Sequence, residues 1–145
     1  MESKLIDYSF TLETEQDLLD DVNTRVKNSR ITKDFGNQKW QYGTEESYLK
    51  DLIHYWINDY DWRAQEKKIN AFSHYKIEID KIPIHFIYEK GSGENPKPLI
   101  LSHGWPWTFW DYQKIIGPLA HPERYGGNID DSFDVIVPSL PCLLY

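Results

Sequence analysis

The spacing of apolar side chains changes near Phe72, and that change limits the folds open to this chain. Before Phe72, apolar residues recur every three or four positions, as on one face of an α-helix. After it, they alternate with polar residues or form short continuous runs, which is typical of β-strands. The sequence therefore predicts an α/β fold, with a helical segment over residues 1–73 and the first strands of a sheet over residues 74–145.

Three helices are predicted in the first segment. One spans about residues 14–29 with Thr14 as its N-cap, a second begins after a cap at Thr44, and a third follows Asp61. The first 13 residues lack a period, so we expect them to be irregular or extended. The apolar stripes are Leu18, Leu19, Val22 and Val26 in the first helix and Leu49, Leu52, Ile53 and Trp56 in the second.

Aromatic residues are concentrated in residues 40–112 and make up 15% of the chain. Those on the predicted helices have two explanations. We expect them to form a core between the helices, and an apolar ligand pocket is the alternative. The residues concerned are Tyr48, Tyr55, Trp56, Tyr60 and Trp62.

Two strands of alternating pattern follow Phe72, over residues 75–79 and 82–88. They are separated by Asp80 and Lys81, which predicts a β-hairpin with its turn at these two residues.

Two continuous apolar runs lie further on, at residues 99–101 and 133–137. Such runs are typical of parallel strands buried on both faces. A helix is predicted over about residues 107–120 between them, because apolar residues recur there at helical spacing. Strand, helix and strand in this order predict a βαβ unit.

Composition excludes several classes of function. The chain has 16 Lys and Arg against 23 Asp and Glu, a net charge of −7, so we expect no affinity for nucleic acid or for anionic membranes. Its single cysteine, Cys142, cannot build a disulfide framework, and the spacing of His, Asp and Glu does not predict a metal site. No cofactor is expected. The polar N-terminus predicts neither a signal peptide nor a membrane span, which favours the cytoplasm.

The segment Ser102–Pro106 is the strongest candidate for a functional site. It directly follows the apolar run at residues 99–101, and ligands of open α/β sheets bind at the carboxyl ends of strands. Gly104 permits a sharp turn, and we expect a cis peptide between Trp105 and Pro106. Such a turn directs backbone N–H groups outward, as an oxyanion hole requires.

The tetrapeptide His103-Gly104-Trp105-Pro106 resembles the HGxP oxyanion motif of epoxide hydrolases of the microsomal and juvenile-hormone type, in the α/β-hydrolase superfamily. A series of upstream motifs, in the same order, resembles the N-terminal domain of these enzymes. The resemblance covers about residues 5–141. The upstream motifs are Trp40-x-Tyr42-Gly43, Tyr48-Leu49, Tyr55-Trp56, Tyr60-Asp61-Trp62-Arg63, Glu66, Ile69-Asn70-x-Phe72, Ile79-Asp80 and Ile84-His85-Phe86-Ile87.

The resemblance implies hydrolysis of a small apolar epoxide to a vicinal diol through a covalent ester on an Asp. In that family, lid tyrosines donate to the epoxide oxygen, and a His–acid pair activates water to hydrolyse the ester. The backbone N–H at the x position stabilises the oxyanion, and this role falls on Trp105 here. His103, Gly104 and Pro106 then shape the turn.

The chain departs from the family pattern in two places. Trp107-Thr108 stands where Gly-Ser usually follows the turn, which predicts a crowded helix start. After Pro141 the family continues with Gly-Tyr-Gly, whereas this chain continues with Cys142 and ends at Tyr145. We therefore expect no nucleophile, catalytic acid or catalytic base in this chain. The α/β-hydrolase sheet is expected to be truncated, with an open apolar edge that favours self-association or complementation by another chain.

Other histidines and acids do not form a second catalytic set. His54 and His85 are interpreted as ordinary helix and strand residues, and Asp134 as the start of a strand rather than a nucleophile elbow. Two alternatives remain open. The chain is a catalytically inactive remnant or a binding module, or it belongs to another α/β hydrolase, such as a haloalkane dehalogenase or an esterase, that shares the turn.

Overall fold

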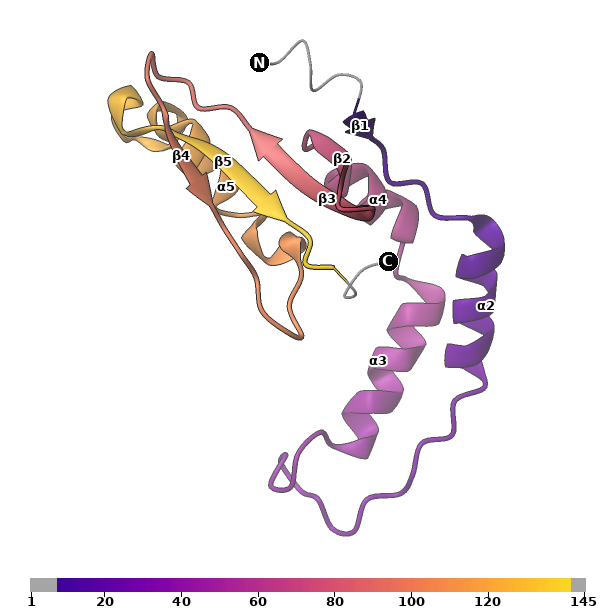
Figure 1. Ribbon diagram of the computed structural model, residues 1–145. Coiled ribbons are helices and arrows are strands. Elements are labelled where there is room, and N and C mark those ends of the chain that lie inside the picture. Colours follow the sequence, from indigo (N-terminus) through magenta and orange to yellow (C-terminus); the bar gives the residue numbers. More distant parts are fainter. Residues whose placement is uncertain (1–7, 142–145) are drawn as a thin grey trace. The chain divides into compact units, whose positions relative to one another are not determined.

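The computed structural model describes residues 8–141, which form helices and one mixed sheet (Figure 1). Cys142 lies outside the described residues. The chain divides into two compact units. Residues 13–66 form the helical unit, and the residues before Glu13 combine with those after Glu66 to form the sheet unit.

The helical unit contains α2 (Gln16–Lys27) and α3 (Glu46–Asn58), which lie side by side, and the start of α4 (Trp62–Ile69) (Figure 1). All three predicted helices are present. The predicted caps of the first two are wrong, because the N-cap positions are Glu15 and Glu45 and neither side chain makes a capping hydrogen bond. The predicted cap of α4 is confirmed: the Asp61 carboxylate accepts a hydrogen bond from the Ala64 N–H, at 3.0 Å.

Four of the five aromatic side chains expected to form a core between the helices are about half exposed, so that expectation is wrong. Neither α2 nor α3 contains a buried residue. Two helices alone cover too little surface to enclose large rings. The exposed fractions are 48% for Tyr48, 51% for Tyr55, 43% for Trp56 and 38% for Tyr60.

The sheet unit contains five strands in the spatial order β1-β2-β3-β5-β4. They are β1 (Ser9–Phe10), β2 (His74–Ile79), β3 (Ile82–Glu89), β5 (Phe133–Pro138) and β4 (Lys97–Ile100). The predicted hairpin is confirmed, since β2 and β3 pair antiparallel with Ile79 opposite Ile82. The predicted parallel pair is confirmed in β4 and β5. Strand β1 was not predicted, because its two residues take their order from pairing with β2 rather than from a local pattern.

The helix predicted over residues 107–120 is wrong as a single element. The structure has a short 3₁₀ helix, η2 (Phe109–Tyr112), followed by α5 (Ile116–Ala120). Pro118 explains the break, because proline has no N–H to donate within a helix and its ring clashes with the carbonyl four residues before. Starting α5 at Ile116 places Pro118 in a first turn, where that N–H is not needed. Two further 3₁₀ turns, η3 (Pro122–Tyr125) and η4 (Ile129–Asp131), lead to β5.

The apolar core lies between α5 and the sheet strands β3 and β5. It consists of Ile87, Ile116, Ala120, Val135 and Val137, all with 0% exposed surface. Strand β4 forms one edge of the sheet, and its Ile100 is 63% exposed. The expectation that this strand is buried on both faces is therefore wrong in the part of the chain that the structure describes.

The two-residue turn between β2 and β3 places both Asp80 (φ 51°) and Lys81 (φ 66°) in the left-handed region. Two-residue hairpin turns of this kind favour glycine, because a Cβ is crowded there. We expect Lys81→Gly to raise the free energy of unfolding by about 0.5–1 kcal/mol in urea denaturation. Lys81→Ala, which keeps the Cβ, is the control and is expected to give no gain. An equal gain in both variants would contradict this explanation.

Candidate functional site

The candidate turn leaves the sheet where β4 runs parallel to β5. One residue beyond β4, the Leu101 N–H still donates to the Ile136 carbonyl, at 2.9 Å. The parallel pairing therefore continues up to Ser102. The following turn is thereby fixed at the carboxyl end of β4, the edge at which α/β proteins bind ligands.

Residues 104–107 form a tight β-turn. The Trp107 N–H donates to the Gly104 carbonyl at 2.7 Å, and the peptide between Trp105 and Pro106 is cis, which confirms the sequence prediction. The side chains of Trp105 and Trp107 are 79% and 61% exposed. A Cβ built on Gly104 meets no heavy atom within 4 Å, so there is open space beside this residue.

Hydrogen bonds hold the two residues that precede this turn. The buried His103 accepts through Nε2 from the Leu140 N–H at 3.3 Å, which ties the turn to the residues after β5. The Tyr112 hydroxyl donates to the Ser102 carbonyl at 2.8 Å. These two bonds and the bond from the Trp107 N–H to the Gly104 carbonyl, all within the described residues, engage groups other than the Trp105 N–H.

Thr108 caps the 3₁₀ helix η2 directly after the turn, and the crowding expected at Trp107-Thr108 stays a prediction. The Thr108 hydroxyl oxygen accepts from the Trp110 N–H at 3.2 Å, and its own N–H donates to the Asp111 carboxylate at 2.8 Å. Two N–H groups at the start of η2 are thus satisfied by side chains, as in a capping box.

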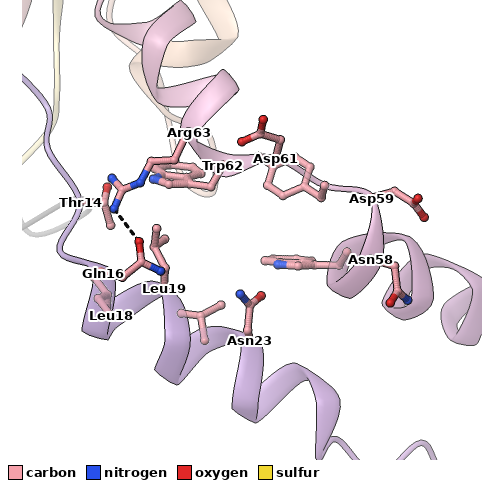
Figure 2. Close-up of a pocket in the computed structure, with 13 residues that line it drawn as sticks. Thr14, Gln16, Leu18, Leu19, Asn23, Asn58, Asp59, Asp61, Trp62 and Arg63 are labelled. Carbon is pink, nitrogen blue, oxygen red and sulfur yellow. Dashed lines mark hydrogen bonds between the residues drawn. The ribbon is translucent and has the colours of Figure 1, made fainter.

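A hollow with a volume of about 610 Å³ lies in the helical unit. Figure 2 shows the labelled side chains of α2 on one side of it and those of residues 58–63 on the other. Its apolar walls contain Leu18, Leu19, Val22, Trp56, Tyr60 and Trp62. Three of the helical aromatic residues therefore line a cavity, as the alternative explanation from the sequence requires. A ligand for this cavity stays a prediction.

Two polar residues at this hollow are held by the carboxylate of Glu66. Glu66 accepts from the Thr14 N–H at 2.7 Å and from the Arg63 guanidinium at 2.8 Å. Arg63 also donates to the Gln16 side chain at 3.1 Å, a bond drawn in Figure 2. These bonds, that from Thr14 first, lower the pKa of Glu66 to about 2. At neutral pH Glu66 is therefore a carboxylate that fixes the position of Thr14 and Arg63 beside the cavity.

Residues 8–141 contain no group of three or more His, Cys, Asp or Glu arranged to hold a metal ion. Within the same residues, every helix is too short or too polar to span a bilayer.

Comparison with known proteins places these features in a family context. Residues 8–112 match the family model described as "Epoxide hydrolase N terminus". The chain is 38% identical over 136 residues to "Epoxide hydrolase 1" of Sus scrofa, and 30% identical over 136 residues to "Juvenile hormone epoxide hydrolase" of Manduca sexta. Each match covers 91% of this chain. The chain spans about three tenths of these relatives, 30% and 29% of their length.

Solved structures give the same result. The chain superposes on the Aspergillus niger epoxide hydrolase with a TM-score of 0.79 at 28% identity, covering 92% of this chain and 35% of that one. It superposes on the juvenile hormone epoxide hydrolase of Bombyx mori, also with a TM-score of 0.79, at 25% identity, covering 92% of this chain and 32% of that one.

The lowered pKa of Glu66 predicts an acid-dependent loss of stability. A carboxyl group with a pKa of about 2 in the folded chain and 4.5 without these partners stabilises the fold above pH 4.5. That contribution is lost as the pH falls from about 4.5 to about 2. We expect Glu66→Gln to cost roughly 1–2 kcal/mol at pH 7 and to remove this part of the pH dependence, measured by denaturation over that range. Glu78→Gln, at an exposed strand position, is the control. Parallel stability curves for the Glu66 variant and the unmodified chain would exclude this role.

Proposed function

Because the chain belongs to the epoxide hydrolase family, we propose that it supplies the N-terminal domain and the oxyanion turn of an enzyme that hydrolyses small apolar epoxides to vicinal diols. The observation that carries this proposal is the tight turn at Gly104–Trp107, which follows β4 at the carboxyl end of a parallel strand pair. The match to the family model over residues 8–112, a range that includes the turn, also supports it.

Trp105 contributes its backbone N–H in this proposal. When water attacks the carbonyl carbon of a covalent ester, the carbonyl oxygen gains negative charge, and a fixed N–H donor lowers the energy of that state. Two features support this role. The hydrogen bonds of the turn and its supports leave the Trp105 N–H out, and the space beside Gly104 is open. His103 and Pro106 keep the turn in shape, so the donor needs no reorganisation during the reaction.

The nucleophile, the catalytic acid and the catalytic base lie outside these 145 residues in this proposal. Asp134 and His121 have structural partners. Asp134 accepts from the Gly91 N–H at 2.9 Å, and His121 is bonded to Glu89 at 2.8 Å. The chain alone is therefore expected to be inactive. A cytoplasmic location is part of the same proposal and rests on the polar sequence alone.

A binding module is the second candidate, favoured by the aromatic cavity between α2 and α4. It requires no chemistry at the turn. The two candidates differ in whether the Trp105 N–H matters once a catalytic remainder is supplied.

A chimera tests the proposed role of Trp105. The chain replaces the aligned N-terminal part of the Sus scrofa enzyme, and diol formation from an aryl epoxide is measured. We expect the chimera to be active and the chain alone to form no diol. Trp105→Pro, which removes the N–H, is expected to lower kcat about a hundredfold or more. Trp105→Ala, which keeps the N–H and removes only the exposed ring, is expected to lose far less. Equal activity of the folded proline variant would remove the oxyanion role.

The exposed edge strand supports a further proposal, that the chain pairs with other chains through β4. Ile100 is 63% exposed on this edge, and unprotected apolar edges favour pairing between chains. We expect the purified chain to sediment above the mass of one chain and Ile100→Lys to shift it towards the monomer. Ile82→Lys is the matched control, since Ile82 is 49% exposed but lies on the paired strand β3. If the Ile82 variant dissociates the chain equally, the edge is not responsible.

A further inference from the structure

Three buried polar side chains form a line of hydrogen bonds across the sheet unit. His74 lies on β2, His85 on β3 and Ser139 directly after β5, with exposed fractions of 4%, 3% and 4%. His74 Nδ1 lies 2.9 Å from His85 Nε2, and His85 Nδ1 lies 2.7 Å from the Ser139 hydroxyl. At the other end, His74 Nε2 lies 2.7 Å from the carbonyl oxygen of Ile69, at the end of α4.

The donor and acceptor of each bond follow from the Ile69 carbonyl when both rings are neutral. A carbonyl oxygen only accepts, so His74 Nε2 carries the proton and His74 Nδ1 is an acceptor. His85 Nε2–H must then donate to His74, which leaves His85 Nδ1 as an acceptor. The Ser139 hydroxyl therefore donates to His85. All the hydrogen bonds of the line are therefore donated in the same direction, from Ser139 towards Ile69, and both rings are in the Nε2–H form.

The surroundings keep these rings neutral. The ring of Phe109 packs edge-on against both histidines, with centroids 5.8 Å from His74 and 5.0 Å from His85. Burial lowers the pKa of His74. Burial is also the largest cause of the lowered pKa of His85, which is about 4. Lys76, and His74 when it is protonated, act in the same direction on the pKa of His85. Uncharged rings at neutral pH are the form in which the line of bonds is complete.

Residues 139–140, at the Ser139 end of this line, also contact the candidate turn. The Ser139 N–H also donates to the His85 carbonyl, at 2.8 Å, so Ser139 is bonded to His85 through both backbone and side chain. The next residue, Leu140, donates its N–H to His103. Ser139 is thus held by His85, and Leu140 is bonded to His103 at the start of the turn.

We propose that Ser139, His85 and His74 are positioning residues, whose directed hydrogen bonds hold the backbone at Ser139 and Leu140 in place and through it the His103–Pro106 turn. They do not touch a substrate. The effect of this positioning on catalysis rests on the function proposed for Trp105. The line of hydrogen bonds itself is independent of that proposal.

The first test uses the full 145-residue chain and reads the two imidazoles and the Leu140 amide by NMR. We expect both histidines to show the Nε2–H form at pH 7. Ser139→Ala removes the hydroxyl donor, so it is expected to shift the His85 Nδ1 signal and to speed exchange of the Leu140 amide about tenfold. Ser139→Thr, which keeps the hydroxyl, is expected to restore both signals.

A matched control separates positioning from general loss of stability. Ser132 is as buried as Ser139, at 3%, lies at the other end of β5 and accepts from the Gly93 N–H at 2.9 Å. Ser132→Ala is expected to destabilise the chain while leaving the His85 signal and the Leu140 exchange unchanged. The Nδ1–H form in either histidine, or equal Leu140 exchange in the Ser139→Ala and Ser132→Ala variants, would overturn the proposal.

The second test uses the active chimera. Ser139→Ala is expected to lower kcat about tenfold with little change in KM, and Ser139→Thr to restore it. If the Trp105→Pro chimera retains full activity while the NMR results are as expected, the proposed function fails and the positioning line stands. If Ser139→Ala changes neither NMR signal while Trp105→Pro abolishes turnover, the positioning proposal fails alone.

Discussion

The structure of the sheet unit depends on the insertion of β5 between β3 and β4. It pairs antiparallel with β3 on one side and parallel with β4 on the other, and it contributes Val135 and Val137 to the fully buried core. Helix α5 packs over the same strand. Without β5, β4 has no neighbour in the described sheet and α5 loses its main contact with the strands. The backbone after β5 also carries the contacts of His103 and His85. One strand therefore links the core, the edge and the turn.

The turn shows how a backbone N–H can be held ready without using its own side chain. The rings of Trp105 and Trp107 point largely into solvent, while the bonds of His103 and Tyr112 hold the residues just before the turn. A donor placed in this way is rigid because its neighbours are rigid. In the proposed function, the chemistry at Trp105 is therefore as sensitive to buried residues of the sheet as to residues beside the substrate.

Local patterns in the sequence predicted the three helices of the helical unit, the hairpin and the cis turn, because each depends on residues close together in the chain. The parallel pair joins distant residues and was predicted from two continuous apolar runs separated by a helical pattern. The break before α5 was also a local matter, and Pro118 was the signal that apolar spacing alone overlooked. Other features depend on distant residues. Phe10 gains its strand only from His74, and the exposure of Trp56 depends on what covers it. The face of β3 that carries His85 and Ile87 is the buried one because α5 packs against the sheet, which an alternating pattern could not decide.

The strand order has a consequence for the route by which the chain folds. The β2–β3 hairpin joins residues close in sequence and can form early, since closing a two-residue turn costs little chain entropy. Strands β3 and β4 find their common partner only when residues 133–138 arrive. During synthesis, the apolar edge of β3 is therefore exposed from its appearance until about 45 further residues have left the ribosome. Over that interval the nascent sheet is open to wrong pairing, so the wait for β5 is the stage of folding at which misassembly is expected.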